Sequence, residues 1–152
     1  MSLSLAGQRA ALQAQIKSAL DASAQPANVY DYPPDSPQLN AVLIMPRQSE
    51  DGNYVGYHGT FNGTAGALCR VGWRVEIRCG GGQIDAAKAM DLYLSTGNAE
   101  SVLDALLDDP TLGSAVQTIQ IGGVSVPAWF TGADEARTWL SAFFDVDVSA
   151  RR

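Results

Sequence analysis

The sequence predicts a single α+β domain over residues 1–152, with a mostly antiparallel sheet, two helices packed on one face and an N-terminal helix. Two observations support this prediction. Segments near the middle and the end of the chain alternate apolar and polar residues with the period of two that marks strands, whereas residues 4–22 and 85–95 repeat apolar residues at helical spacing. In chain order a helix precedes three strands, two helices and three more strands, which suits one sheet with helices gathered on one side. The length is enough for one ordinary core and too short for two.

The N-terminal part is expected to hold one helix and two short strands. The helix covers residues 4–22, and Pro26 follows its end, as is common after a helix terminus. Val29 to Tyr32 forms a short extended piece that leads into a proline-rich turn. Ala41 to Met45 is an apolar run bounded by Pro46, the pattern of a buried strand.

Residues 47–66 differ in kind from the rest of the chain. They contain five glycines and two asparagines, and few residues that could anchor a core. Asn62-Gly63 is the signal of a type I′ hairpin turn. The sequence therefore predicts a long, mobile hairpin loop here.

The clearest strand runs from Val71 to Cys79, where every second residue is apolar, so that one face is buried and the other is wet. Three glycines break it, and a helix is expected from Asp85 to Ser95. Asn98 is expected to cap a second short helix that ends at Leu107. The residues expected to face inward from these two helices are Ala86, Ala89, Met90 and Tyr93, and Val102, Ala105 and Leu106.

The C-terminal part is predicted to hold three strands. Val116 to Ile121 and Val124 to Trp129 are expected to be joined by a turn at Gly122-Gly123, and the last strand runs from Arg137 to Val148. Both faces of this last strand carry bulk: Trp139 and Phe143 on one, Leu140 and Phe144 on the other. A two-layer domain needs only one of these faces for its core, so either a helix or another subunit covers the second face.

No group of residues has the spacing or the number of partners that a catalytic, metal or phosphate site requires. The single histidine, His58, has no metal-ligating residue at a suitable spacing. Gly80 to Gly82 precede a helix but match no phosphate-loop fingerprint. Cys69 and Cys79, if they lie on one strand, are separated by roughly 33 Å, too far for a disulfide, so two buried thiols are expected. We expect no enzyme, no cofactor and no metal site.

Charge and hydropathy argue against two further classes of protein, nucleic-acid binders and membrane proteins. The net charge of −6 disfavours a dedicated nucleic-acid binder, which needs clustered Lys and Arg. No apolar run approaches the roughly 20 residues that span a bilayer, and no signal peptide is visible. We therefore expect a soluble protein that is made in the cytosol and does not contact a membrane.

Three tracts resemble the tail terminator proteins of long-tailed bacteriophages of the actinophage type. These are VYDYPPDSPQLNAVLI (Val29 to Ile44), SVLDALLDDPTLG (Ser101 to Gly113) and RTWLSAFFDVDVSA (Arg137 to Ala150). With the helix before the second tract, the resemblance spans nearly the whole chain. It implies a domain like that of the phage lambda terminator and a virion protein at the junction of tail and neck, made in the cytoplasm of the host bacterium.

The resemblance also implies partners. Such proteins form a ring, usually six-fold, that stops polymerisation of the major tail tube protein and then offers a surface to the head-closure or connector protein. DNA would pass through the channel without specific binding, which fits the acidic charge. The surfaces expected to make these contacts are residues 47–66, ordering on assembly, and the surplus aromatic residues. The residues are Tyr54, Tyr57, His58, Phe61, Trp129, Phe130, Trp139 and Phe143.

Two alternatives remain open. A head-closure or head–tail adaptor protein of the neck has a similar size and role. From a different class, a small α+β ligand-binding domain or enzyme could use residues 47–66 as a lid over a pocket with converging polar groups.

Overall fold

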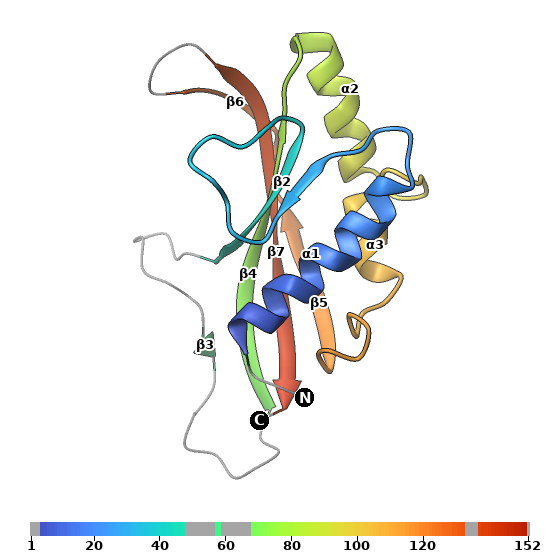
Figure 1. Ribbon diagram of the computed structural model, residues 1–152, viewed down its shortest axis with the longest axis vertical. Coiled ribbons are helices and arrows are strands. Elements are labelled where there is room, and N and C mark those ends of the chain that lie inside the picture. The colour runs from blue at the N-terminus through green and yellow to red at the C-terminus, as the bar shows by residue number, and fades with distance from the viewer. Residues whose placement is uncertain (1–3, 48–56, 59–67, 133–136, 152) are drawn as a thin grey trace.

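The computed structural model describes residues 4–47, 57–58, 68–132 and 137–151. In this part of the chain three helices and one seven-stranded mixed sheet form an α+β fold (Figure 1), as the sequence predicts. The elements are α1 (Leu5–Asp21), β1 (Asn28–Tyr30), β2 (Ala41–Pro46), β3 (Tyr57–His58), β4 (Leu68–Cys79), α2 (Gln83–Leu94), α3 (Val102–Leu107), β5 (Thr118–Val124), β6 (Ala128–Thr131) and β7 (Thr138–Arg151).

The sheet has the strand order β1-β2-β4-β7-β5, with β3 added to β4 and β6 added to β7. Only β1 and β2 are parallel, so the sheet is mostly antiparallel. The long strand β7 lies between the others: one side pairs with β4, and the other side pairs with β6 near the start of β7 and with β5 near its end. β7 can hold two shorter strands in series because it spans 14 residues.

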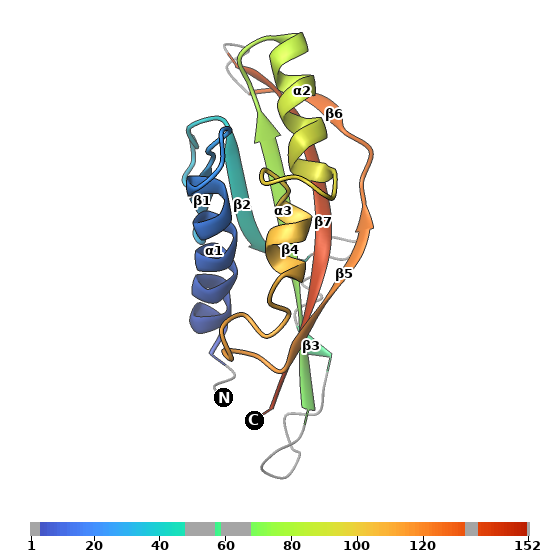
Figure 2. The ribbon, with the colours of Figure 1, turned by 90° about the vertical axis from the view of Figure 1, so that its right-hand side faces the viewer.

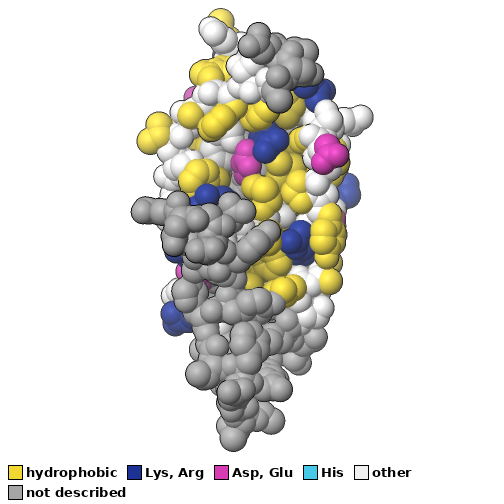
Figure 3. Space-filling model, turned by 90° about the vertical axis from the view of Figure 1, so that its left-hand side faces the viewer, with side chains coloured by type: hydrophobic (Ala, Val, Ile, Leu, Met, Phe, Trp, Pro, Cys, Tyr) yellow, Lys and Arg dark blue, Asp and Glu magenta, His cyan; other side chains and the backbone are white. Residues whose placement is uncertain are grey.

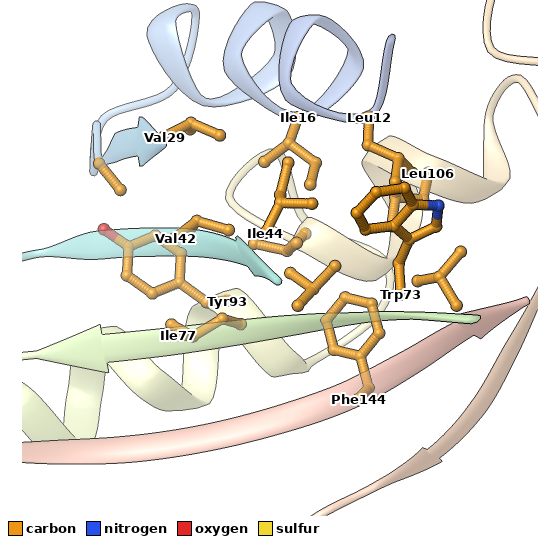
Figure 4. Close-up of a cluster of buried hydrophobic side chains, with 14 of the residues drawn as sticks. Leu12, Ile16, Val29, Val42, Ile44, Trp73, Ile77, Tyr93, Leu106 and Phe144 are labelled. Atoms are coloured by element: carbon orange, nitrogen blue, oxygen red, sulfur yellow. The ribbon is translucent and has the colours of Figure 1, made fainter. Parts of the chain in front are cut away.

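All three helices lie on one face of the sheet (Figure 2). The period-two pattern of β4 explains the core beneath them, because Val71, Trp73, Val75, Ile77 and Cys79 are all buried. On β7 the same face carries Leu140, Ala142, Phe144, Val146 and Val148, which are buried as well. Figure 4 shows Leu12 and Ile16 of α1 pointing toward the sheet, from which Trp73 and Phe144 point back toward the helix.

α1 and α2 form where the sequence predicts them, and α3 ends at Leu107 as predicted. α1 begins after Ser4, whose hydroxyl accepts a hydrogen bond from the backbone N–H of Gly7 at 3.2 Å. The inner faces of α2 and α3 are also as predicted. The buried residues are Ala86, Ala89, Met90 and Tyr93 on α2, and Val102, Ala105 and Leu106 on α3. None of the helices in the described ranges is long and apolar enough to cross a membrane.

Two sequence-based predictions are wrong in detail. Gly122-Gly123 is not a turn between paired strands: β5 continues through both glycines, with a register shift between Ile121 and Val124 that marks a bulge. β5 and β6 therefore both pair with β7 and not with each other. The cap of α3 is Ser101 and not Asn98, since the Ser101 hydroxyl accepts from the backbone N–H of Asp104 at 3.0 Å.

Cys69 and Cys79 lie on one continuous strand, β4, which is the condition under which the sequence excludes a disulfide between them. Cys79 is buried and free, and desolvation raises its pKa from about 9 to about 12. The side chain of Cys69 lies outside the described part, and so does the hairpin predicted at 47–66 apart from Arg47 and the two residues of β3.

Candidate functional site: the open face of the sheet

The face of the sheet opposite the helices carries a layer of aromatic and charged side chains, which we call the open face (Figure 3). Because side chains alternate along a strand, it receives the residues of β4 and β7 that do not enter the core. It is formed by Met45, Arg47, Arg74, Glu76, Arg78, Phe130, Trp139, Ser141, Phe143, Asp145 and Asp147. Within the described ranges no helix covers it. The helices therefore cover the Leu140 and Phe144 side of β7 and leave the Trp139 and Phe143 side without a helix.

Four of these residues form an ion-pair cluster at one end of the open face. Arg74 and Asp145 are directly opposite each other on β4 and β7, with Arg74 Nε 3.0 Å from Asp145 Oδ1. Arg47, just after β2, lies 3.5 Å from the second oxygen of Asp145. Arg47 also donates to Asp147 at 3.2 Å. Asp145 is thus shared by two guanidinium groups, and the cluster ties three neighbouring strands together.

A second pair lies closer to the other end. Arg78 Nε donates to Glu76 Oε1 at 2.6 Å, and Arg78 Nη2 donates to Glu76 Oε2 at 3.3 Å. The hydroxyl of Ser141, on β7, donates to Glu76 Oε1 at 2.8 Å. Bidentate pairs of this kind are geometrically fixed and stronger than single neutral hydrogen bonds. Glu76 is therefore held by one cation on its own strand and one hydroxyl across the strand pair.

The arginines also stack on the aromatic residues of the open face. The guanidinium carbon of Arg74 is 3.8 Å from the centroid of the Phe143 ring, and that of Arg78 is 5.0 Å from the Trp139 ring. Both distances are in the range of attractive cation–π contacts. The indole N–H of Trp139 has no acceptor among the described residues, although its nitrogen is shielded from solvent.

The open face is hollowed by a groove of about 620 Å³. Its lining mixes apolar and ionic side chains from β2, β4, β6 and β7, together with the link between β5 and β6. The lining residues are Met45, Pro46, Arg74, Glu76, Arg78, Ser125, Val126, Ala128, Phe130, Trp139, Ser141 and Phe143. A groove of this kind can receive an apolar side chain or a short segment of another molecule, while the arginines and Glu76 offer directed polar contacts.

The connection between β1 and β2 bounds one end of this region. Arg137 Nη1, just before β7, donates to Ser36 Oγ at 3.1 Å and to the carbonyl of Pro37 at 3.3 Å. A second hollow, of about 370 Å³, lies between this connection, Arg78 and Trp139. The proline-rich turn predicted from the sequence is therefore anchored to the start of the last strand.

The structure brings together three of the aromatic residues predicted to make contacts and separates a fourth from them. Phe130 is directly opposite Trp139 in the β6–β7 pair and shares the groove with Phe143. Trp129 is opposite Leu140, so it points to the helix side, where it lines a separate hollow of about 230 Å³ beside Gly82 and Gln83. Trp129 and Phe130 alternate across the sheet because they are adjacent in one strand.

The other predicted contact residues cannot be placed in this site. Tyr57 and His58 form β3, which pairs with β4 at Val71 and Arg70, but their side chains lie outside the described part. Tyr54 and Phe61 lie outside the described residues altogether. The grouping of these four residues with the open face stays a prediction.

The ion pairs of the open face were not predicted from the sequence. The charged residues themselves are visible in the sequence. One strand carries Arg74, Glu76 and Arg78 at its solvent-facing positions, and another carries Asp145 and Asp147. Assigning partners requires the register between the two strands, which lie about 70 residues apart in the chain. The alternation of apolar and polar residues predicts which face of the sheet a side chain occupies, but it does not predict which residues of two strands are opposite each other.

Comparison with models of known protein families gives no match, and no curated protein matches the chain. In the described ranges no group of three or more His, Cys, Asp or Glu side chains is arranged to hold a metal ion.

Proposed function

We propose that this protein is a structural virion component that caps the head-proximal end of a phage tail tube. It would end polymerisation of the tube and provide the surface for head–tail joining. The observation that carries the proposal is the open face, where Phe130, Trp139 and Phe143 surround a groove that no helix in the described ranges covers. The sequence resemblance to tail terminators supplies the class of partner.

The chemistry of the open face suits burial against another protein. Aromatic residues and arginine are enriched at the centres of protein interfaces. The acids Glu76 and Asp145 are already paired with arginines within the chain. A partner that covers the face therefore meets few uncompensated charges, and uncompensated charges are the costly ones to desolvate.

The assembly that we propose is a ring, of six subunits as in the family that the chain resembles. A closed ring uses heterologous contacts, in which one surface of each subunit meets a different surface of the next. Its partners are then the neighbouring copies, the major tail tube protein and the head-closure or connector protein, at the junction of tail and neck. DNA passes through the channel without specific binding, consistent with the net charge of −6 per chain.

The test is capping of tubes assembled from the purified major tail tube protein. With this protein present, electron microscopy should show shorter tubes that carry an added layer at one end. Replacing Trp139 and Phe143 with serine should abolish the layer, because the substitutions remove the apolar surface of the groove. Replacing Ile84 with serine is the matched control, since Ile84 is an exposed apolar residue on α2, on the helix side of the sheet.

The outcomes separate the alternatives within the same class. No binding of the wild-type chain to the tube protein would overturn the tail-terminator role. Binding to the head connector without binding to the tube would indicate a head-closure or head–tail adaptor protein of the neck. Capping that survives the paired serine substitutions would show that the open face is not the contact surface.

The volume of the groove favours a second candidate from a different class. At about 620 Å³ it lies within the range of small-molecule sites, so a ligand-binding domain is the competing function. Against it, the ionic groups that line the groove are already paired, Arg78 with Glu76 and Arg74 with the neighbouring Asp145, and do not converge on an empty centre. Native mass spectrometry of the purified protein distinguishes the two candidates, because a resident ligand would add a discrete mass.

A further inference from the structure

The two outer edges of the sheet differ in whether another part of the described chain contacts them. At the β1 edge, side chains of α1 occupy backbone carbonyls: Gln13 donates to Val29 at 2.9 Å, and Arg9 donates to Asp31, just after β1, at 2.8 Å. The opposite edge is formed by β5 and β6, which lie along the margin of the sheet (Figure 2). No other strand of the described chain pairs there.

The hydrogen bonds to β7 show which backbone groups of β6 point outward. Gly132 N–H donates to the carbonyl of Arg137 at 2.7 Å, and Ser125 N–H donates to that of Phe143 at 2.8 Å. Odd-numbered residues of β7 therefore turn their backbone toward this edge. Since bonded and non-bonded pairs alternate in an antiparallel ladder, Trp129 and Thr131, opposite Leu140 and Thr138, direct their N–H and C=O groups away from β7.

The chemistry of this edge is unusual for one that stays in water. Edge strands are commonly protected by charged residues, above all lysine, but residues 114–132 contain no charged side chain. All four residues of β6 are exposed, with Trp129 at 47% and Phe130 at 51%. Pro127 and the bulge in β5 precede β6 and leave its own backbone available.

We propose that β6 pairs with β6 of a second copy of this chain, antiparallel, across a two-fold axis at Phe130. In this register Trp129 of one copy is opposite Thr131 of the other, and both residues direct their backbone groups outward. Each such pair exchanges two hydrogen bonds, so the edge is complementary to itself. The two Phe130 rings face each other in a pair without backbone hydrogen bonds, an arrangement in which aromatic residues attract.

The self-complementary register favours a second copy as the occupant, and the absence of charged side chains along residues 114–132 permits it. Each chain has a net charge of −6, so two copies repel one another on average. The charge-free tract is where two copies can meet without like charges in contact. This inference goes beyond the proposed function and does not depend on it, because it concerns a two-fold contact of the free chain at the sheet edge, although Phe130 belongs to both surfaces. The proposed function uses the open face and the partners of a tail.

The test is the mass of the full chain in solution, measured by sedimentation equilibrium. Without the tail tube protein, the free wild-type chain should have twice the chain mass of 16.1 kDa. Thr131→Pro removes an N–H group that points away from β7, so the variant should sediment at the mass of one chain. Thr131→Val is the matched control, since it keeps the N–H and should remain dimeric.

Phe130→Lys gives an independent variant, because it places two like charges on the proposed two-fold axis and should also yield a single-chain mass. Circular dichroism checks that each variant is folded, and Phe130→Lys decides the matter if Thr131→Pro does not fold. A wild-type chain that is monomeric at every concentration, or a dimer that survives in both folded variants, would overturn the proposal. Either result leaves the tube-capping test unaffected.

Discussion

Trp73 and Gln8 form a buried hydrogen bond that joins the sheet to the N-terminal helix. The indole Nε1 of Trp73, on β4, donates to Oε1 of Gln8, on α1, at 3.0 Å. Each residue is only 1% exposed, so neither partner can turn to water instead. The amide nitrogen of Gln8 has no acceptor among the described residues, which makes this single bond the only polar contact found for that side chain.

Replacing Gln8 with alanine should lower the free energy of unfolding by about 2 kcal/mol, because it leaves the indole N–H of Trp73 buried and unsatisfied. Urea denaturation measures the change. A double-mutant cycle with Trp73→Phe isolates the bond, since Gln8→Ala should cost clearly less when the indole is absent. Equal costs in the two backgrounds would mean that Gln8 acts through packing alone.

The shared carboxylate of Asp145 should contribute more to stability than that of Asp147. Asp145→Asn weakens contacts to both Arg47 and Arg74, whereas Asp147→Asn weakens one contact to Arg47. These side chains are partly exposed, so we expect a loss of about 1 kcal/mol for Asp145→Asn and less for Asp147→Asn. Thermal unfolding at low and high salt measures both. The difference between the variants should shrink as salt is added, and an unchanged difference would exclude an electrostatic origin.

Asp109 should titrate below the usual range of an aspartate. Its carboxylate accepts from the hydroxyl of Thr111 at 2.6 Å, from the backbone N–H of Gly113 at 2.6 Å and from that of Thr111 at 2.9 Å. These hydrogen bonds lower its pKa, the Thr111 hydroxyl most of all. The stabilisation is therefore present above the ordinary carboxyl pKa of about 3.9 and is lost as the pH falls through the lower, folded-state value.

The measurement for Asp109 is the chemical shift of its carboxyl carbon as a function of pH. Thr111→Val is the control, because it removes the hydroxyl and should move the titration midpoint back toward about 3.9. A midpoint at or above that value in the wild-type protein would show that the turn after α3 does not depend on the ionised carboxylate.

How far the sequence predicts this protein depends on whether a feature is local. The buried face of β4 follows from its alternation, because a strand between two neighbours has one face for the core whatever its register. The Gly122-Gly123 step does not follow in this way. Two glycines fit a bulge as well as a turn, and only the length of β7 decides that β5 and β6 pair with it in series.

The same distinction applies to the candidate site. The sequence predicts that one face of the last strand has apolar residues to spare, and Trp139 and Phe143 indeed lie on the face that no described helix covers. It groups Trp129 with Phe130, although neighbours in a strand point to opposite faces. The ion pairs were not predicted because they depend on the register between β4 and β7, which no local pattern specifies.

The cap of α3 provides a last test, since the sequence offers two capping residues three positions apart. Ser101 accepts from the backbone N–H of Asp104, whereas Asn98 accepts from that of Glu100 at 2.9 Å and donates to the carbonyls of Leu92 and Ser95, both at 3.2 Å. Ser101→Ala should therefore lower the free energy of unfolding by about 1 kcal/mol and speed hydrogen exchange of the Asp104 amide. Asn98→Ala should speed exchange of the Glu100 amide and leave that of Asp104 largely protected. The reverse pattern would place the helix start at Asn98, as the sequence alone predicts.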